Sequence, residues 1–232
     1  MVRFGLWYDF RNPPAWRRPL ASLYAETFEQ IRWAETLGYD DIWTTEHHFV
    51  DDDYAPSLLP ICAAIAAQTT RVRVGTAVLL LPLHDPVRIA EDAAVVDAIS
   101  GGRLDLGVGL GYRVAEFAAM NIPTRQRGRR MDEALKLIRR AWSGGTFSFE
   151  GEFYRYTNID VTPKPVQAPM PLWVGGISEP AARRAARLGT GFQAGAGADM
   201  VPAYLDECAR LSRAPGGVMK GMPFHAVAED VD

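Results

Sequence analysis

Short apolar runs alternate with longer segments of helical pattern along the first hundred residues. The runs at 3–8, 41–45, 71–81 and 103–109 are apolar almost throughout, and segments of helical pattern at 22–37, 57–68 and 85–99 separate them. Strands of a parallel sheet are apolar throughout because helices cover them. The order therefore predicts a parallel α/β architecture, either a β/α barrel or a doubly wound sheet.

The alternation pauses between residues 110 and 170 and then resumes. The pause contains a predicted helix at 128–142 and an aromatic segment at 147–154, which is typical of a β-hairpin turned at Glu150-Gly151. After it the pattern predicts three strands and two helices, with strands at 172–175, 191–194 and 224–228 and helices at 179–188 and 202–211. We therefore expect one domain over residues 1–232, with seven strands and an insertion at about 110–170.

Composition and charge exclude several classes of protein. The chain is 48% hydrophobic and 23% charged with a net charge of −3, which is ordinary for a globular protein and unlike a nucleic-acid-binding one. No signal peptide is recognisable, and the longest apolar stretches are about ten residues, whereas a membrane span needs about 20. We expect a cytoplasmic protein with no nucleic-acid or membrane partner. Cys62 and Cys208 are expected to be buried structural thiols.

The most specific chemical signal is Glu46-His47-His48, directly after the predicted second strand. In a barrel the active site lies where the strands end. Adjacent histidines on extended backbone point to opposite sides, so one of them can face the barrel mouth. A neutral imidazole there can act as a general base or stabilise a developing anion, whereas two structural histidines are the alternative. No metal is expected, because the His-Glu-x-x-His spacing is absent.

Two glycine-rich segments follow later strands. Gly107-Val108-Gly109-Leu110-Gly111 lacks the dinucleotide-binding spacing, so we interpret its glycines as allowing close approach of a ligand or of neighbouring backbone. Gly175-Gly176-Ile177-Ser178 leads into a predicted helix, whose free N–H groups favour a phosphate. Ser178 is equally a favoured helix cap, and the two roles are compatible.

Two further features are an arginine cluster and an unusually apolar helix. Four arginines (Arg125, Arg127, Arg129 and Arg130) lie in the insertion, where they form either a solvated face or a guanidinium clamp for a phosphate. The helix at 57–68 is apolar nearly all round, so we expect another surface to cover it. This predicts a homodimer through that helix and the helix at 88–99.

Taken together, these segments resemble the bacterial-luciferase-like flavin monooxygenase family. The resemblance is carried by blocks that follow one another in the order seen in the family: Thr45–Phe49, Val74–Leu83, Asp85–Arg88, Ser100–Gly107, Glu116-Phe117, Trp173–Gly176 and Ala185–Gly189. It implies a TIM-type (β/α)8 barrel with flavin at the carboxyl ends of the strands. Here the barrel is expected to be truncated after its seventh strand. Either a partner chain or a loop covers the open strand edges, or the sequence is a fragment of a longer protein.

The resemblance also implies roles for individual residues. His47 matches the active-site histidine, and Glu116 matches an acidic residue close to it. Thr76-Ala77 matches a position where relatives hold a cis, non-proline peptide beneath the isoalloxazine. Ser178 and Arg129 match phosphate contacts. The full set of expected cofactor-binding residues is Glu46, Thr76, Ala77, Arg129, Gly175, Gly176, Ile177 and Ser178.

The implied activity is that of a monooxygenase using reduced FMN and O2 on a small organic substrate. Because no nicotinamide site is visible, the reduced flavin is expected from a separate reductase. The resemblance leaves two alternatives open: a hydride-transferring oxidoreductase that uses a deazaflavin coenzyme, and a non-catalytic flavin-binding homologue. Leu110 departs from the luminous enzymes, which carry an arginine for the phosphate there. The sequence does not name the substrate.

Overall fold

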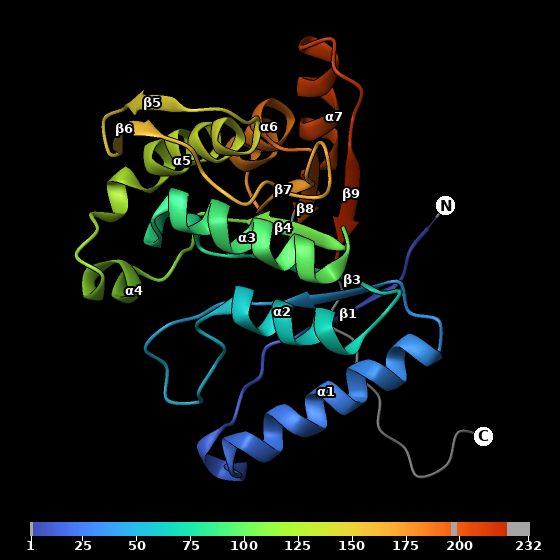
Figure 1. Cartoon of the computed structure of the whole chain (residues 1–232). Coiled ribbons are helices and arrows are strands. Elements are labelled where there is room, and N and C mark those ends of the chain that lie inside the picture. The colour runs from blue at the N-terminus through green and yellow to red at the C-terminus, as the bar shows by residue number, and fades with distance from the viewer. Residues whose placement is uncertain (1, 196–198, 222–232) are drawn as a thin grey trace.

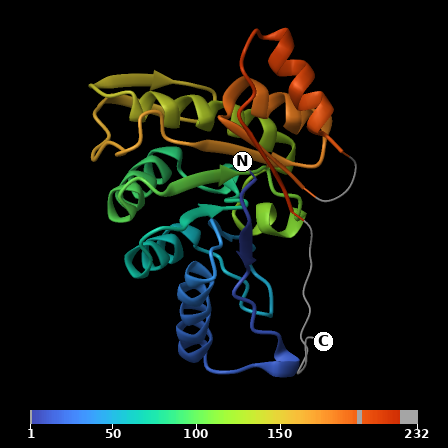
Figure 2. The same ribbon diagram turned by 90° about the vertical axis from the view of Figure 1, so that its right-hand side faces the viewer.

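The computed structural model describes residues 2–195 and 199–221. Its main feature is a curled sheet of seven strands, all parallel, in the order β1-β2-β3-β4-β7-β8-β9 (Figures 1 and 2). The strands are β1 (Gly5–Tyr8), β2 (Asp41–Thr44), β3 (Arg73–Thr76), β4 (Leu104–Val108), β7 (Leu172–Gly176), β8 (Gly191–Ala194) and β9 (Gly217–Lys220). The prediction of a TIM-like barrel that lacks the eighth strand is confirmed for the described residues.

Helices pack along the outer, convex side of this sheet (Figure 2). They are α1 (Leu20–Thr36), α2 (Leu58–Gln68), α3 (Pro86–Ser100), α5 (Arg127–Trp142), α6 (Glu179–Leu188) and α7 (Val201–Arg210). α3 illustrates how local sequence sets their ends. The Asp85 carboxylate accepts the N–H groups of Val87 and Arg88, Pro86 starts the helix, and Gly101 ends it at φ 63°.

The segment between β4 and β7 adds elements outside the strand–helix alternation. It contains α4 (Val114–Ala119), a 3-10 turn (Thr124–Gln126), α5, and a hairpin of β5 (Phe147–Glu150) and β6 (Arg155–Ile159). The sequence analysis did not predict α4, and it placed the second hairpin strand too early. The Glu133 carboxylate sets the longer turn, because it accepts the backbone N–H groups of Glu152, Phe153 and Tyr154.

Two predicted strands differ in the structure. The strand expected at 71–81 ends at Thr76, after which a cis peptide joins Ala77 to Val78 and Leu79 forms an isolated bridge with Val108. A 3-10 turn (Leu81–Leu83) then leads to α3. The seventh strand of the sheet is β9, whereas the segment predicted for it, 224–228, lies outside the described residues.

Two tryptophan rings fill the amino-terminal part of the space that the sheet encloses. Trp43 and Trp173 are 4% and 9% exposed and meet edge to face with their centroids 6.0 Å apart. Glycines on neighbouring strands leave the room for them, since a Cβ on Gly75 would lie 2.4 Å from the Trp43 ring and one on Gly191 2.5 Å from Trp173. The two rings therefore fill the base of the space beneath the carboxyl edge of the sheet.

The remaining expectations about the body of the protein have mixed outcomes. Cys62 and Cys208 are buried and unpaired, as predicted, and burial raises the pKa of Cys62 to about 12. Among the helices of residues 2–195 and 199–221, none combines the length and apolar character needed to cross a bilayer. Most of the apolar side chains of α2 are buried within the chain itself. The homodimer therefore stays a prediction.

Gly75→Ala should destabilise the fold, because its Cβ would press on the Trp43 ring and on the Asp105 carbonyl oxygen, 2.6 Å away. Overpacking of this kind costs about 1–3 kcal/mol. Gly128→Ala is the matched control. It lies in α5 with its nearest neighbour 3.5 Å from the added atom, so it should stabilise by about 0.5–1 kcal/mol. Urea unfolding measures both. An unchanged midpoint for Gly75→Ala would contradict the tight packing of this layer.

Candidate active site

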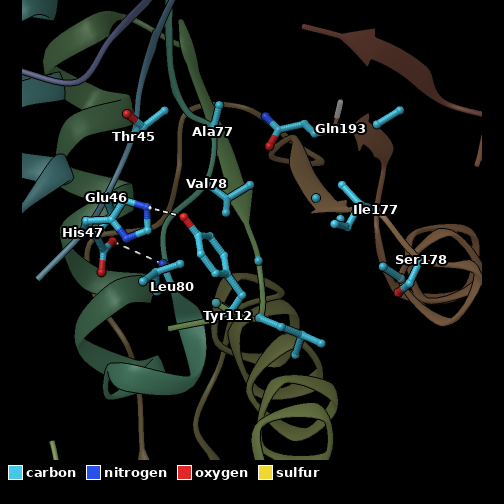
Figure 3. A pocket seen from close by; sticks show the side chains of 18 of the residues that line it. Thr45, Glu46, His47, Ala77, Val78, Leu80, Tyr112, Ile177, Ser178 and Gln193 are labelled. Atoms are coloured by element: carbon cyan, nitrogen blue, oxygen red, sulfur yellow. Dashed lines mark hydrogen bonds between the residues drawn. The ribbon is translucent and has the colours of Figure 1, made fainter. Parts of the chain in front are cut away.

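A cavity of about 530 Å³ opens at the carboxyl edge of the sheet (Figure 3). Its walls come from the segments that follow β2, β3, β4, β7 and β8, together with Trp7 of β1, Met219 of β9 and Arg127 of α5. Parallel pairing directs all these strand ends to one side, which is why residues so distant in the sequence meet there. Most of the predicted site residues border this cavity.

His47 lies on one wall between a carboxylate and a phenol. Its Nδ1 is 2.8 Å from Oε1 of Glu116 in α4, and its Nε2 is 3.2 Å from the hydroxyl of Tyr112 (Figure 3). Glu116 is 1% exposed and also accepts the backbone N–H of His48 at 3.0 Å. The carboxylate therefore fixes both the orientation of the imidazole and the backbone that carries it. The other carboxylate oxygen, Oε2, has no partner among the described groups.

Glu46 faces away from His47 and anchors the loop after β3. Its Oε1 lies 2.7 Å from Nε2 of His48 and 2.8 Å from Nε2 of His84, and its Oε2 accepts the backbone N–H of Leu80 at 3.1 Å. These side chains offer atoms close enough to hold a metal ion, within 4.8 Å of one another, but the same atoms already satisfy each other by hydrogen bonding. That no metal binds stays a prediction.

Glu46 and His48 in this buried cluster each favour the charged form of the other. The hydrogen bond to Glu46 raises the pKa of His48, although burial opposes that rise. Burial acts most strongly to raise the pKa of Glu46, but hydrogen bonds from His48 and His84 outweigh it and lower that pKa below its usual value. Glu46 is thus held as a carboxylate that ties the end of β2 to the segment leading into α3.

Val78 rises into the middle of the cavity between two glycines. A Cβ on Gly109 or on Gly175 would lie 2.4 Å from a methyl group of Val78. The loop after β3 can therefore cross the mouth of the sheet because Gly109, directly after β4, and Gly175, near the end of β7, carry no side chain. The cis peptide lies between Ala77 and Val78, one residue further along than the sequence analysis placed it.

A buried amide lies beside this ridge. Nε2 of Gln193 donates to the carbonyl oxygen of Thr76 at 3.1 Å, and Oε1 of Gln193 is buried with no partner among the described residues. The Thr76 hydroxyl donates to the carbonyl oxygen of Gly107 at 2.6 Å. Gln193 lines the cavity, and its oxygen is enclosed beside it without a hydrogen-bond partner among the described residues.

The N-terminus of α6 forms the far wall of the cavity, across from His47 (Figure 3). Ser178 is its capping residue, with extended backbone and with no hydrogen bond from its side chain to the helix. The Ser178 hydroxyl and the backbone N–H of Glu179 thus remain available for an anion, whereas Pro180 has no N–H and the N–H groups of Ala181 and Ala182 donate to the Ser178 carbonyl oxygen. Arg127 also lines this cavity.

The structure brings most of the predicted site residues together. Those that line the cavity are Glu46, His47, Ala77, Gly175, Gly176, Ile177 and Ser178. Thr76 and Glu116 lie directly behind this layer and contact it by hydrogen bonds. Arg129 is not part of the wall. Its exposed side chain pairs with Glu152 at 2.5 Å, and Arg127 is the arginine that reaches the cavity.

The sequence analysis gave no role to Tyr112, which follows β4, or to Gln193, which lies in β8. Both occupy strand ends, which was the signal that could have drawn attention to them. Their hydrogen bonds join segments that are 65 and 117 residues apart in the chain. No local pattern encodes such contacts.

The fold and the cavity agree with the comparisons with known proteins. A family model described as luciferase-like monooxygenase matches residues 2–231, so the chain belongs to this family. Over 155 residues it is 34% identical to the oxygenase component of a flavin-dependent trigonelline monooxygenase from Acinetobacter baylyi, which covers 66% of this chain and 43% of that protein. Over 167 residues it is 36% identical to an F420-dependent glucose-6-phosphate dehydrogenase from Kineococcus radiotolerans, covering 68% and 49%.

Among solved structures, the chain is similar to the monooxygenase RslO1 from Streptomyces bottropensis. The TM-score is 0.87 at 27% sequence identity, and the alignment covers 94% of this chain and 70% of that one. The chain spans about half the length of the curated relatives it matches, between 43% and 58%. The family thus contains both flavin-dependent monooxygenases and F420-dependent oxidoreductases.

Proposed function

We propose that the chain is a flavin-dependent monooxygenase that uses reduced FMN and O2 on a small organic substrate. The observation that carries the proposal is the shape of the cavity wall. Val78 forms a ridge that is packed between Gly109 and Gly175, and the part of the cavity over this ridge is a slot with room for a ring system. The capping end of α6 lies at the far side of the same cavity, at a place suited to a phosphate.

The residues present fit FMN in three ways. The slot accepts the isoalloxazine, the unpaired Gln193 Oε1 can accept a hydrogen bond from it, and Ser178 with the N–H groups beside it can hold the phosphate. Arg127 can supply the guanidinium that the luminous enzymes carry at the position of Leu110. We also assign cofactor binding to the other predicted residues that line the cavity, which are Glu46, Ala77, Gly175, Gly176 and Ile177. Thr76 supports this wall from behind.

Reduced FMN, when bound, would supply the electron pair that reduces O2, so that one oxygen atom enters the substrate and the other leaves as water. The chain's own residues orient the ligands, exclude water and handle a proton. His47 is the proton-handling group and Glu116 orients its ring, because Oε1 of Glu116 lies 2.8 Å from Nδ1 of His47. Trp7, Tyr54 and Leu80 provide apolar walls that restrict access of water.

Several accompanying proposals follow. Reduced FMN would come from a separate reductase, a proposal supported by the Acinetobacter relative, which is the oxygenase component of its monooxygenase. We infer one domain over residues 1–232 with the insertion at about 110–170, a homodimer through α2 and α3, and a cytoplasmic location.

The second candidate function is that of a hydride-transferring oxidoreductase using a deazaflavin coenzyme. It is favoured by the relative from Kineococcus, which is 36% identical to this chain, against 34% for the monooxygenase relative. A deazaflavin shares the ring shape and the phosphate-bearing tail of FMN, so the slot and the end of α6 suit both. The two coenzymes differ in their reaction with O2.

Titration with reduced cofactors tests the proposal. Under anaerobic conditions, reduced FMN should bind at micromolar concentration, and mixing the complex with O2 should release H2O2 in the absence of substrate at a rate unlike that of free reduced FMN. Absorbance spectroscopy and a peroxide assay provide the two readouts. Binding of the reduced deazaflavin coenzyme alone, with no consumption of O2, would replace the first candidate with the second. FMN binding without any change in its oxidation rate would leave a non-catalytic flavoprotein.

The phosphate assignment is tested by a matched pair of arginine variants. Arg127→Ala should weaken FMN binding about tenfold or more, because one charge-assisted hydrogen bond contributes about 1.5–3 kcal/mol. It should leave the affinity for riboflavin, which lacks the phosphate, unchanged. Arg129→Ala is the control and should change neither affinity, since that side chain pairs with Glu152. Equal loss of FMN and riboflavin affinity in Arg127→Ala would contradict a phosphate contact.

A further inference from the structure

We propose that Tyr112 is a catalytic residue, through whose hydroxyl His47 exchanges a proton with the molecule in the cavity. The inference rests on the proposed function, because it concerns the proton that His47 handles there. It goes beyond the assignment of His47 and Glu116 by naming the atom that meets the ligand. The argument depends on the two ring nitrogens of His47 and on what each of them contacts.

Neither ring nitrogen of His47 is left for a ligand. Nδ1 is engaged by Oε1 of Glu116 at 2.8 Å, and Nε2 by the Tyr112 hydroxyl at 3.2 Å (Figure 3). The His47 side chain is only 17% exposed, whereas Tyr112 is 74% exposed and lines the cavity. The phenol oxygen is therefore the polar atom that this chain of hydrogen bonds presents to the cavity.

The buried carboxylate sets the direction of the hydrogen bonds. An ionised Glu116 can only accept, so Nδ1 of His47 carries the proton between them. Nε2 of the neutral imidazole is then an acceptor, and the Tyr112 hydroxyl donates to it. Carboxylate, imidazole and hydroxyl thus form a linear series, in which each group orients the next.

A proton can pass along this series with all bonds balanced. When the ligand gives a proton to the phenol oxygen, one O–H bond forms and the original O–H bond breaks, with its proton moving to Nε2. His47 becomes an imidazolium stabilised by Glu116, and Tyr112 is again a neutral phenol. The reverse transfer returns the proton to the ligand. No oxidant or reductant takes part, so the relay serves whichever step of the reaction needs a proton.

The backbone before Tyr112 holds the phenol in this place. Gly111 adopts φ 73°, in the left-handed region that a side chain rarely allows, and a Cβ there would lie 3.2 Å from the Phe117 ring. The Tyr112 ring meets the His47 imidazole edge to face, with centroids 5.5 Å apart. A glycine turn therefore directs Tyr112 back over His47 instead of away into solvent.

The other titratable groups around His47 do not take the place of Tyr112. Tyr54 also meets the imidazole edge to face, at 4.8 Å, but its hydroxyl pairs with the Thr45 hydroxyl at 2.6 Å. Arg113 approaches Glu116 from the start of α4, at 3.9 Å, on the side away from Nε2. Glu46 and His48 form their own cluster, and Arg127 lines the cavity from α5.

The first test measures the hydrogen bond in the protein without any cofactor. Long-range ¹H–¹⁵N NMR of His47 should show a protonated Nδ1 and an unprotonated Nε2 that accepts a hydrogen bond. In Tyr112→Phe the Nε2 resonance should move toward that of a free acceptor. Tyr54→Phe, the same change on the other tyrosine beside His47, should leave it in place. A protonated Nε2 in the wild type, or an unmoved resonance in Tyr112→Phe, would overturn the proposal.

The second test measures the reaction. Tyr112→Phe should bind reduced FMN as the wild type does but release H2O2 about a hundredfold more slowly, the usual size of a lost acid–base contribution. His47→Ala should lose as much, and the double variant should lose no more, because the two groups act as one unit. A wild-type or faster rate in Tyr112→Phe would mean that the ring merely covers His47, and would overturn the relay. Failure of wild-type protein to bind reduced FMN would instead overturn the proposed function, leaving the NMR result to be judged on its own.

Discussion

Parallel pairing of all seven strands is the constraint on which the rest of the structure depends. It sends every strand end to one edge of a curled sheet, so that side chains far apart in the sequence share one cavity. Trp43 and Trp173 close the other end of the enclosed space. The described part of the protein thus has a filled base and an open mouth, which is lined mainly by the segments that follow the strands.

Two buried carboxylates organise that mouth from opposite sides of one strand end. Glu46 forms hydrogen bonds with two imidazoles and with the Leu80 N–H, and these bonds fix the loop that carries the Val78 ridge. Glu116 forms hydrogen bonds with the His47 imidazole and with the His48 N–H, and these bonds fix the orientation of His47. A charge buried this deeply is tolerated only with several donors around it, so each carboxylate keeps its neighbours in place.

The parts of the site that consist of consecutive residues could be predicted from the sequence. The Glu46–His48 block and the bend at Gly175–Ser178 each lie within one strand end, and both reach the cavity. The choice between Arg127 and Arg129 could not be made in this way. Residues two apart on a helix point about 200° away from each other, and only the docking of α5 through side chains such as Met131 and Leu135 decides which one faces inward.

Other features required contacts that no short pattern contains. α4 is six residues long, and the partner that buries its Glu116 is a strand end reached only after folding. The extent of β3 and the cis peptide after it depend on glycines at the ends of β4 and β7, which alone allow the loop to cross the mouth. The hydrogen bond between Tyr112 and His47 likewise joins two strand ends whose proximity follows from the order of the sheet.

A crystal structure of the protein soaked with FMN tests the central claim most directly. The account predicts electron density for the isoalloxazine over the Val78 ridge, between Gly109 and Gly175, with the phosphate at Ser178 and the first turn of α6. An empty cavity at saturating FMN, or a ring bound elsewhere on the molecule with the slot filled by side chains, would contradict it.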